Sequence, residues 1–222
     1  FFWIGRLMIR LPFSGIVGET ESKSCMVQVP CMEMYNETCD ILNEVRAWFK
    51  DPSLEDFARK YWKKRSYIFQ GFVLSDPMNE ENPPENPIRK FIISPQIFKV
   101  IKSSLMDPDM EELPTDYTNG LDFRIVKNDS GSGFSDYSTS NWARRERPLS
   151  DAEMAAINKF GLYNLRDSLP NIPNATEKKV MFEMFEASVN GEAYDPERWG
   201  NYFKPAGFTV PSSQKPQQAF ST

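Results

Sequence analysis

Short strand-like segments, separated by helices and turns of unequal length, constrain the fold of this 222-residue chain more than any other feature. Apolar, β-branched or aromatic residues gather in these segments, and Gly, Pro and Asn mark the turns between them. The predicted strands cover residues 3–13, 25–29, 66–74, 88–93 and 121–126. About five short strands with irregular insertions fit a small barrel better than a repeating βαβ fold. We therefore predict an α+β fold that is mainly β.

Helix start signals lie between these strands and after them. Ser94 followed by Pro95 marks one start, because proline suits the first helical position. Ser150 and Glu153 have the spacing of a capping box, which marks another. The five predicted helices begin near Thr38 or Asp40, at Ser53 as N-cap, at Ser94, at Ser150 and at Ala175.

Composition excludes several classes of function. The chain has no histidine, which removes the Ser-His-Asp and Cys-His nucleophile systems and the His-based zinc hydrolase sites. The Gly131-x-Gly133 pair lacks the third glycine and the following helix of a nucleotide-binding loop. No pair of acids stands out as catalytic, so we predict that the chain is not an enzyme.

The acidic balance does not exclude nucleic acid as a ligand. The formal net charge is −5, but acids concentrate in residues 76–85 and 107–116. A binding groove responds to its local field and not to the total charge. The chain is therefore polarised, with basic segments that stand apart from acidic ones.

Residues 60–67 interleave cations with aromatic rings and contain no acid. Cations neutralise phosphates and flat rings stack on unpaired bases, so this pattern suits a groove for a single nucleic-acid strand. Lys, Arg, Tyr and Trp also mix at ordinary surfaces, because each has an apolar body and a polar tip. The candidate contacts in this run are Tyr61, Trp62, Lys63, Lys64, Arg65 and Tyr67.

Two further segments repeat the pattern. A Gly-rich turn over residues 129–133 precedes two rings three positions apart, which could stack on bases or cap the core. In the strand over residues 88–93, alternation places Arg89 and Phe91 on one face and Lys90 and Ile92 on the other. The candidate contacts in these segments are Arg89, Phe91, Phe134, Tyr137, Trp142 and Arg144.

The three cysteines are weaker evidence for a metal site than the basic-aromatic segments are for nucleic-acid binding. Their odd number argues against a complete disulfide framework and favours a reducing compartment. Five residues separate Cys25 from Cys31 and seven separate Cys31 from Cys39, whereas structural zinc sites use closer pairs and four ligands. Cys31 and Cys39 are the candidate metal ligands, and small buried thiols are the alternative.

Four segments resemble, in order and rough spacing, the single-stranded DNA-binding (helix-destabilising) protein of T-even-type tailed phages. They are Ile-Arg-Leu-Pro at 9–12, the Lys-Lys-Arg strand at 63–77, the strand and helix at 89–98, and the hairpin at 123–137 that ends in Ser-Gly-Phe-Ser-Asp-Tyr. The resemblance covers about residues 4–145. It implies an OB-fold five-stranded barrel with an inserted small helical subdomain. It also implies sequence-independent coating of single-stranded DNA during phage replication, recombination and repair.

The resemblance assigns roles by position. It implies phosphate contacts for Lys63, Lys64 and Arg65, and stacking or groove-lining rings at Tyr67, Phe91, Phe134 and Tyr137. Tyr61, Trp62, Trp142 and Arg144 come from the local pattern alone. The implied partners are single-stranded DNA, phage replication and recombination proteins, and further copies of the chain along the DNA. The implied location is the cytoplasm of the infected bacterial host.

Two departures from that family bear on cofactors and termini. The family type member holds zinc with one His and three Cys. This chain has no His, and Asn36 stands three residues before Cys39 where a Cys is expected. We therefore expect no cofactor, and zinc bound by Cys31 and Cys39 is the alternative. The basic N-terminal arm and acidic C-terminal tail of the family are not evident, so we expect a core fragment.

The predicted organisation has three parts. Residues 1–147 form the DNA-binding core with its insertion at about 25–60, residues 148–207 form helices that pack on it, and residues 208–222 form a polar, disordered tail. No run is apolar and long enough to span a bilayer. Two alternatives stay open, an RNA-binding module on the same barrel and a phage structural or assembly protein with an aromatic-basic protein interface.

Overall fold

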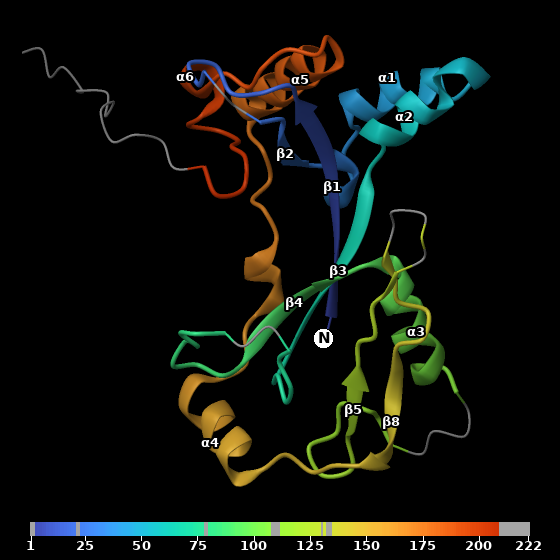
Figure 1. Cartoon of the computed structure of the whole chain (residues 1–222), viewed down its shortest axis with the longest axis vertical. Helices are drawn as coiled ribbons and strands as arrows, with labels where there is room; N and C mark the ends of the chain where they lie inside the picture. The colour runs from blue at the N-terminus through green and yellow to red at the C-terminus, as the bar shows by residue number, and fades with distance from the viewer. Residues whose placement is uncertain are drawn as a thin grey trace, which may run out of the picture. The chain divides into compact units, whose positions relative to one another are not determined.

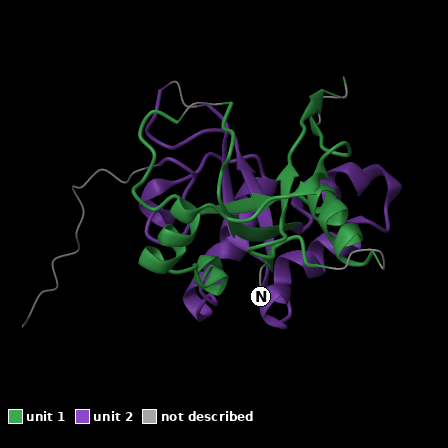
Figure 2. Cartoon of the chain, turned by 90° about the horizontal axis from the view of Figure 1, so that it is seen from below, with its two compact units in different colours: residues 1–6, 65–170 green, residues 7–64, 171–222 purple. Residues whose placement is uncertain are grey.

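The computed structural model describes residues 3–20, 23–77, 80–107, 112–129, 131 and 135–208, and the chain forms two compact units (Figure 1 and Figure 2). Unit 1 comprises residues 1–6 and 65–170, and unit 2 comprises residues 7–64 and 171–222. Each unit is therefore discontinuous in sequence. The predicted boundaries at residues 147 and 207 stay a prediction, because these units are defined by contacts and not by function.

A four-stranded sheet carries the longest strands, in the order β2-β1-β3-β4. Its strands are β1 (Trp3–Phe13), β2 (Cys25–Pro30), β3 (Lys64–Gly71) and β4 (Arg89–Ile93). β1 and β2 pair antiparallel with Ile9 opposite Val29, and β3 and β4 pair antiparallel with Phe69 opposite Phe91. Two short antiparallel pairs add β5 (Leu121–Arg124) with β8 (Asn141–Glu146), and β6 (Asn128–Asp129) with β7 (Ser135–Asp136). The predicted α+β class is confirmed.

Unit 2 has a large, closed core. Strand alternation buries Ile9, Leu11 and Phe13 while Arg10 stays exposed, as a half-buried strand requires. The helices of this unit are α1 (Asp40–Trp48), α2 (Glu55–Tyr61), α5 (Ala175–Val189) and α6 (Pro196–Trp199), with 3-10 turns η1 (Met32–Tyr35) and η2 (Pro52–Leu54). Their apolar faces complete one cluster of buried residues with the β1–β2 pair.

The central cluster of buried residues in unit 1 comes from β3, β4 and the helix α3. The helices of this unit are α3 (Pro95–Leu105) and α4 (Asp151–Phe160), with a 3-10 turn η3 (Leu165–Ser168). The Ser94 side chain accepts a hydrogen bond from the Ile97 amide at the start of α3, as its sequence position predicts. The predicted capping box of Ser150 and Glu153 is confirmed at the start of α4.

Two predicted helix starts are wrong in detail. Cys39 is the N-cap of α1 and its side chain makes no capping hydrogen bond, so neither Thr38 nor Asp40 caps this helix. Ser53 lies inside η2, and its backbone N–H donates a hydrogen bond to the Asp51 carboxylate with an N–O distance of 2.9 Å. Asp51 takes this role because Pro52 suits the first position of the turn that follows it. No helix in the described ranges is both long and apolar enough to cross a membrane.

Candidate nucleic-acid interface

The core of unit 1 is small and is bordered by half-buried rings. Its buried members are Tyr67, Ile93, Ile97, Phe98 and Ile101. Among the residues that the structure describes, six aromatic side chains pack against them while keeping part of their surface exposed: Trp3, Phe69, Phe91, Phe123, Tyr137 and Trp142. We call these six residues the ring border. They come from segments that are far apart in the sequence, and unit 1 brings them together around one helix, α3.

Cross-strand pairing fixes four members of the ring border in place. Phe69 and Phe91 are directly opposite each other on β3 and β4. Phe123 and Trp142 are opposite each other on β5 and β8, with ring centroids 4.9 Å apart in an edge-on arrangement. Such pairs are the unit of sheet stabilisation, and they hold each ring from one side. These four rings are therefore fixed in position and remain partly exposed.

Tyr137 is positioned by α3 and not by a long strand. The Gln96 side-chain oxygen accepts a hydrogen bond from the Tyr137 backbone N–H at 3.1 Å, and its nitrogen donates one to the Asp136 carboxylate. Gln96 is in the first turn of α3, so the helix fixes the segment that carries Tyr137. Phe134, the other ring predicted near this turn, lies outside the described residues.

Tyr67 supports the ring border and contributes little surface of its own. Its side chain is only 8% exposed, and its ring stacks on Phe98 with centroids 3.5 Å apart. Trp3 packs edge-on against the same tyrosine at 5.6 Å. Because one face is covered by Phe98, we do not carry Tyr67 into the interface as a base-stacking ring.

The arginines of unit 1 differ in whether their guanidinium groups are exposed or already paired with an acid. Arg65 and Arg144 are exposed on β3 and β8. Arg144 lies where the β5–β8 register shifts, a site at which a bulge redirects side chains. Arg89, by contrast, donates to the Glu80 carboxylate at 2.9 Å and to the Asn86 carbonyl at 2.7 Å. The two exposed arginines are therefore better placed than Arg89 to meet a phosphate.

The run over residues 60–67 does not act as one surface. Tyr61 is fully buried in unit 2, where its hydroxyl donates to the Ser188 carbonyl at 3.0 Å. Trp62 is half-buried and packs edge-on against Phe49. We do not carry Tyr61 into the interface, because no part of its ring is exposed.

The two lysines of this run have different surroundings, although they are adjacent. Lys63 forms an ion pair with Glu33, which also pairs with Arg46. Lys64 is exposed, and its ammonium donates to the Arg59 carbonyl at 3.0 Å. Partial burial lowers the pKa of Lys64, and the nearby charges of Arg10 and Arg59 lower it further. Arg10, Arg59 and Lys64 are therefore neighbouring cations, which we call the cation cluster of unit 2; Arg59 also forms an ion pair with Glu55 on the same helix.

The ring border contains three residues that sequence reasoning did not select: Trp3, Phe69 and Phe123. A signal for Phe69 existed, because it alternates with Tyr67 on the same strand. Phe123 is one of the strand residues over 121–126, but only its pairing with Trp142 reveals its position. Phe91, Tyr137 and Trp142 were selected, and the structure places them in the border.

The candidate zinc ligands Cys31 and Cys39 lie in the core of unit 2, and the expectation about zinc stays a prediction. Both thiols are buried, and no group of three or more His, Cys, Asp or Glu side chains that could hold a metal ion occurs among the described residues. Structural zinc sites use four such ligands.

No protein-family model matches the chain, and no curated protein matches it significantly. The resemblance to phage single-stranded DNA-binding proteins therefore stays an expectation. The function has to be argued from the geometry of the two units.

Proposed function

We propose that this chain binds single-stranded DNA without sequence preference, by base stacking and phosphate neutralisation. The ring border of unit 1 carries the proposal. Each of its rings packs against the core of unit 1 and is only partly buried, so part of each ring stays accessible to an unpaired base. Stacking on an aromatic side chain contributes about 1–3 kcal/mol per base and tolerates any base.

The arginines and lysines supply the second half of the proposal. Arg65 and Arg144 are exposed in unit 1, and Arg10, Arg59 and Lys64 cluster in unit 2. A bound phosphate relieves the mutual repulsion of clustered cations and releases counterions from the nucleic acid. Affinity should therefore fall steeply as salt rises.

The finer expectations from the resemblance belong to the same proposal. In it, the four-stranded sheet is part of an OB-type five-stranded barrel, and copies of the chain coat DNA during phage replication, recombination and repair. The binding partners are single-stranded DNA and phage replication proteins, in the cytoplasm of the infected host. OB-type grooves bind single strands with rings and cations of this kind.

Quenching of intrinsic tryptophan and tyrosine fluorescence by oligo-dT, at low and at several higher salt concentrations, tests the proposal. We expect strong quenching that weakens steeply with salt. Absence of both quenching and a gel shift at low salt would contradict DNA binding and favour a protein interface. Competition with oligo-rU of equal length separates DNA from RNA, because an RNA-binding module would have to recognise the 2′-hydroxyl.

A further inference from the structure

One carboxylate of unit 2 bridges two cations that come from different segments. Glu33 in η1 accepts hydrogen bonds from Arg46 of α1 on one oxygen and from Lys63, which follows α2, on the other. The second terminal nitrogen of Arg46 donates to the Asn43 side chain at 2.9 Å, so its guanidinium is also held on α1. The carboxylate therefore lies where three segments of this unit meet.

The Trp62 ring lies against the same two cations. The Lys63 ammonium is 5.5 Å and the Arg46 guanidinium 5.9 Å from its centroid, within the range of cation–π interactions. Phe49 packs edge-on against this ring, with centroids 5.2 Å apart. The indole is thus fixed in place, and it holds the two cations near each other independently of the acid.

The surroundings of Glu33 have the chemistry of an anion site. A carboxylate presents two oxygens to its donors, as a phosphodiester does, and arginine binds both groups with the same fork of N–H donors. The hydrogen bond from Lys63 is the main cause of a lowered pKa at Glu33, so this acid is charged at neutral pH. The side chains of Arg46, Lys63 and Glu33 are 45%, 25% and 23% exposed, and ion pairs that water reaches are weak. A phosphate can therefore reach the two cations and replace the carboxylate.

We propose that Arg46, Trp62 and Lys63 form a phosphate site that the Glu33 carboxylate occupies in the free chain, and we call it the masked phosphate site. Its ligand is a phosphate group, either of a bound single strand or free in solution. For a strand, the inference rests on the proposed function: the phosphate contacts the two cations, and the neighbouring base packs on the exposed part of the Trp62 ring. Glu33 lowers the affinity for the strand, because its charge repels the phosphate until the side chain moves away.

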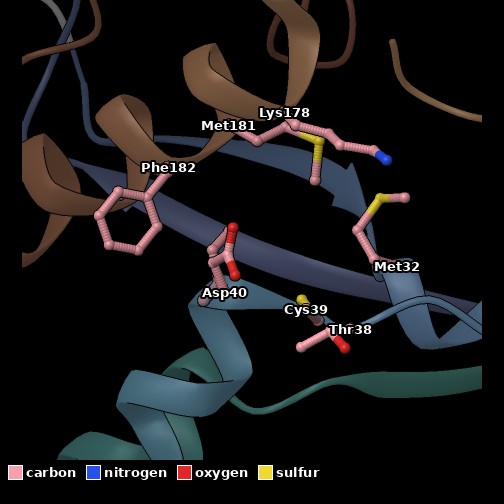
Figure 3. Close-up of a pocket in the computed structure, with 8 residues that line it drawn as sticks. Met32, Thr38, Cys39, Asp40, Lys178, Met181 and Phe182 are labelled. Atoms are coloured by element: carbon pink, nitrogen blue, oxygen red, sulfur yellow. The ribbon is translucent and has the colours of Figure 1, made fainter. Parts of the chain in front are cut away.

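Removal of the Glu33 charge tests the masked phosphate site. Glu33→Gln should bind oligo-dT more tightly than the wild type at low salt, and its log–log salt dependence should be steeper by about 0.7 units for each phosphate gained. Glu37→Gln is the matched control, because it makes the same change of charge and opens the ion pair of Glu37 with Lys178. Lys178 lines a different part of unit 2, a pocket with Asp40 and Phe182 (Figure 3). Equal gains in both variants would overturn the site, since net charge alone would then explain them.

A second substitution in the same background identifies the cation. Glu33→Gln combined with Lys63→Ala should lose most of the gain in affinity, because the site then lacks one of its two cations. A gain that persists in the double variant would overturn the role of Lys63. Circular dichroism checks that each variant is folded.

Inorganic phosphate alone separates the two sources of the ligand. The indole N–H signal of Trp62, assigned in the NMR spectrum with Trp62→Phe, should shift on addition of phosphate in Glu33→Gln and much less in the wild type, whereas chloride of equal ionic strength should not move it. Absence of a shift would overturn the site. A shift with an unchanged DNA salt dependence would restrict the site to free phosphate and overturn the contact with the strand. If no variant binds oligo-dT while Trp62 still responds to phosphate, the proposed function fails and the masked phosphate site stands.

Discussion

The core of unit 2 buries five aromatic rings, whereas the central cluster of unit 1 buries two, Tyr67 and Phe98. Tyr61 and Trp199 in unit 2 are 0% and 1% exposed. The ring border of unit 1 has six members, and each retains accessible surface. Rings of the same kind therefore act differently in the two units. The five buried rings of unit 2 fill a core. In the proposed function, the partly exposed rings of unit 1 are the surface on which bases stack.

The number of covering elements explains the difference. Helices α1, α2 and α5 all contribute buried residues to the core of unit 2. In unit 1, α3 alone supplies the buried helical residues of the central cluster, which are Ile97, Phe98 and Ile101. A single helix cannot cover all the rings that two sheets present. Aromatic content alone thus does not indicate binding, because the extent of cover decides whether a ring is core or surface.

The largest expected effect is on the core of unit 2. Tyr61→Ala removes a fully buried ring, and we expect it to lower the free energy of unfolding by about 3–5 kcal/mol. Tyr61→Phe is the matched control, because it removes only the hydroxyl that donates to the Ser188 carbonyl and should cost about 1–3 kcal/mol. Chemical denaturation measures both values. Unchanged stability with weakened DNA binding would move Tyr61 from the core to the interface.

The next effect is on the surface of unit 1. Phe91→Ala should weaken binding to oligo-dT by about 1–3 kcal/mol, because one stacking ring is lost. Phe49→Ala in unit 2 is the control, since Phe49 is also a partly exposed ring (37%) but lies outside the ring border. Titration of both variants, with circular dichroism to check the fold, measures the difference. Equal losses in the two variants would contradict the ring border as a binding surface.

A smaller effect separates the two neighbouring lysines. Lys64→Ala should flatten the log–log salt dependence of binding by about one unit, because Lys64 belongs to the cation cluster. Lys63→Ala should change that slope less, since Glu33 already neutralises Lys63. Lys179→Ala, an exposed lysine on α5, controls for loss of charge alone. A larger effect from Lys63 than from Lys64 would show that the ion pair opens on binding.

The smallest effect concerns Arg147, which links β5 to α4 in unit 1. Arg147 donates to Asp122 and to Glu153, each at 2.8 Å, and its hydrogen bond lowers the pKa of Glu153. A carboxylate with a lowered pKa stabilises the fold above its unfolded pKa of about 4.3 and loses this contribution as the pH falls toward its folded pKa. Glu153→Gln should therefore flatten the decline in melting temperature between pH 7 and pH 3. A decline equal to that of the wild type would assign the acid sensitivity to other groups.

Local patterns in the sequence predict the main strands and two of the helix caps. The alternation predicted for β4 is confirmed, with Lys90 and Ile92 exposed and Arg89 and Phe91 half-buried. The starts of α3 and α4 are confirmed because each cap depends on residues within four positions. Such features need no knowledge of the rest of the chain.

The candidate site is less predictable, because it depends on contacts between distant segments. Tyr61 falls in a basic-aromatic run, yet its helix turns it toward Ser188, 127 residues later. Tyr137 takes its place from Gln96, 41 residues earlier. Sequence order groups Tyr61, Trp62 and Tyr67 together, whereas packing places Tyr61 and Tyr67 in the cores of different units. The spacing of residues along the sequence does not show which core each of these rings enters.

The divided sequence of unit 2 has a consequence for the order in which the protein forms during synthesis. Phe13 packs against Trp199, with ring centroids 5.4 Å apart. The core of unit 2 around β1 therefore cannot be completed until residue 199 has been synthesised. Residues 65–170 of unit 1 emerge during that interval and are nearly sufficient for their own core. Domains form as units while the ribosome adds about 5–20 residues each second. Unit 1 should therefore fold first, and its folding shortens the loop that must close before unit 2 can complete itself.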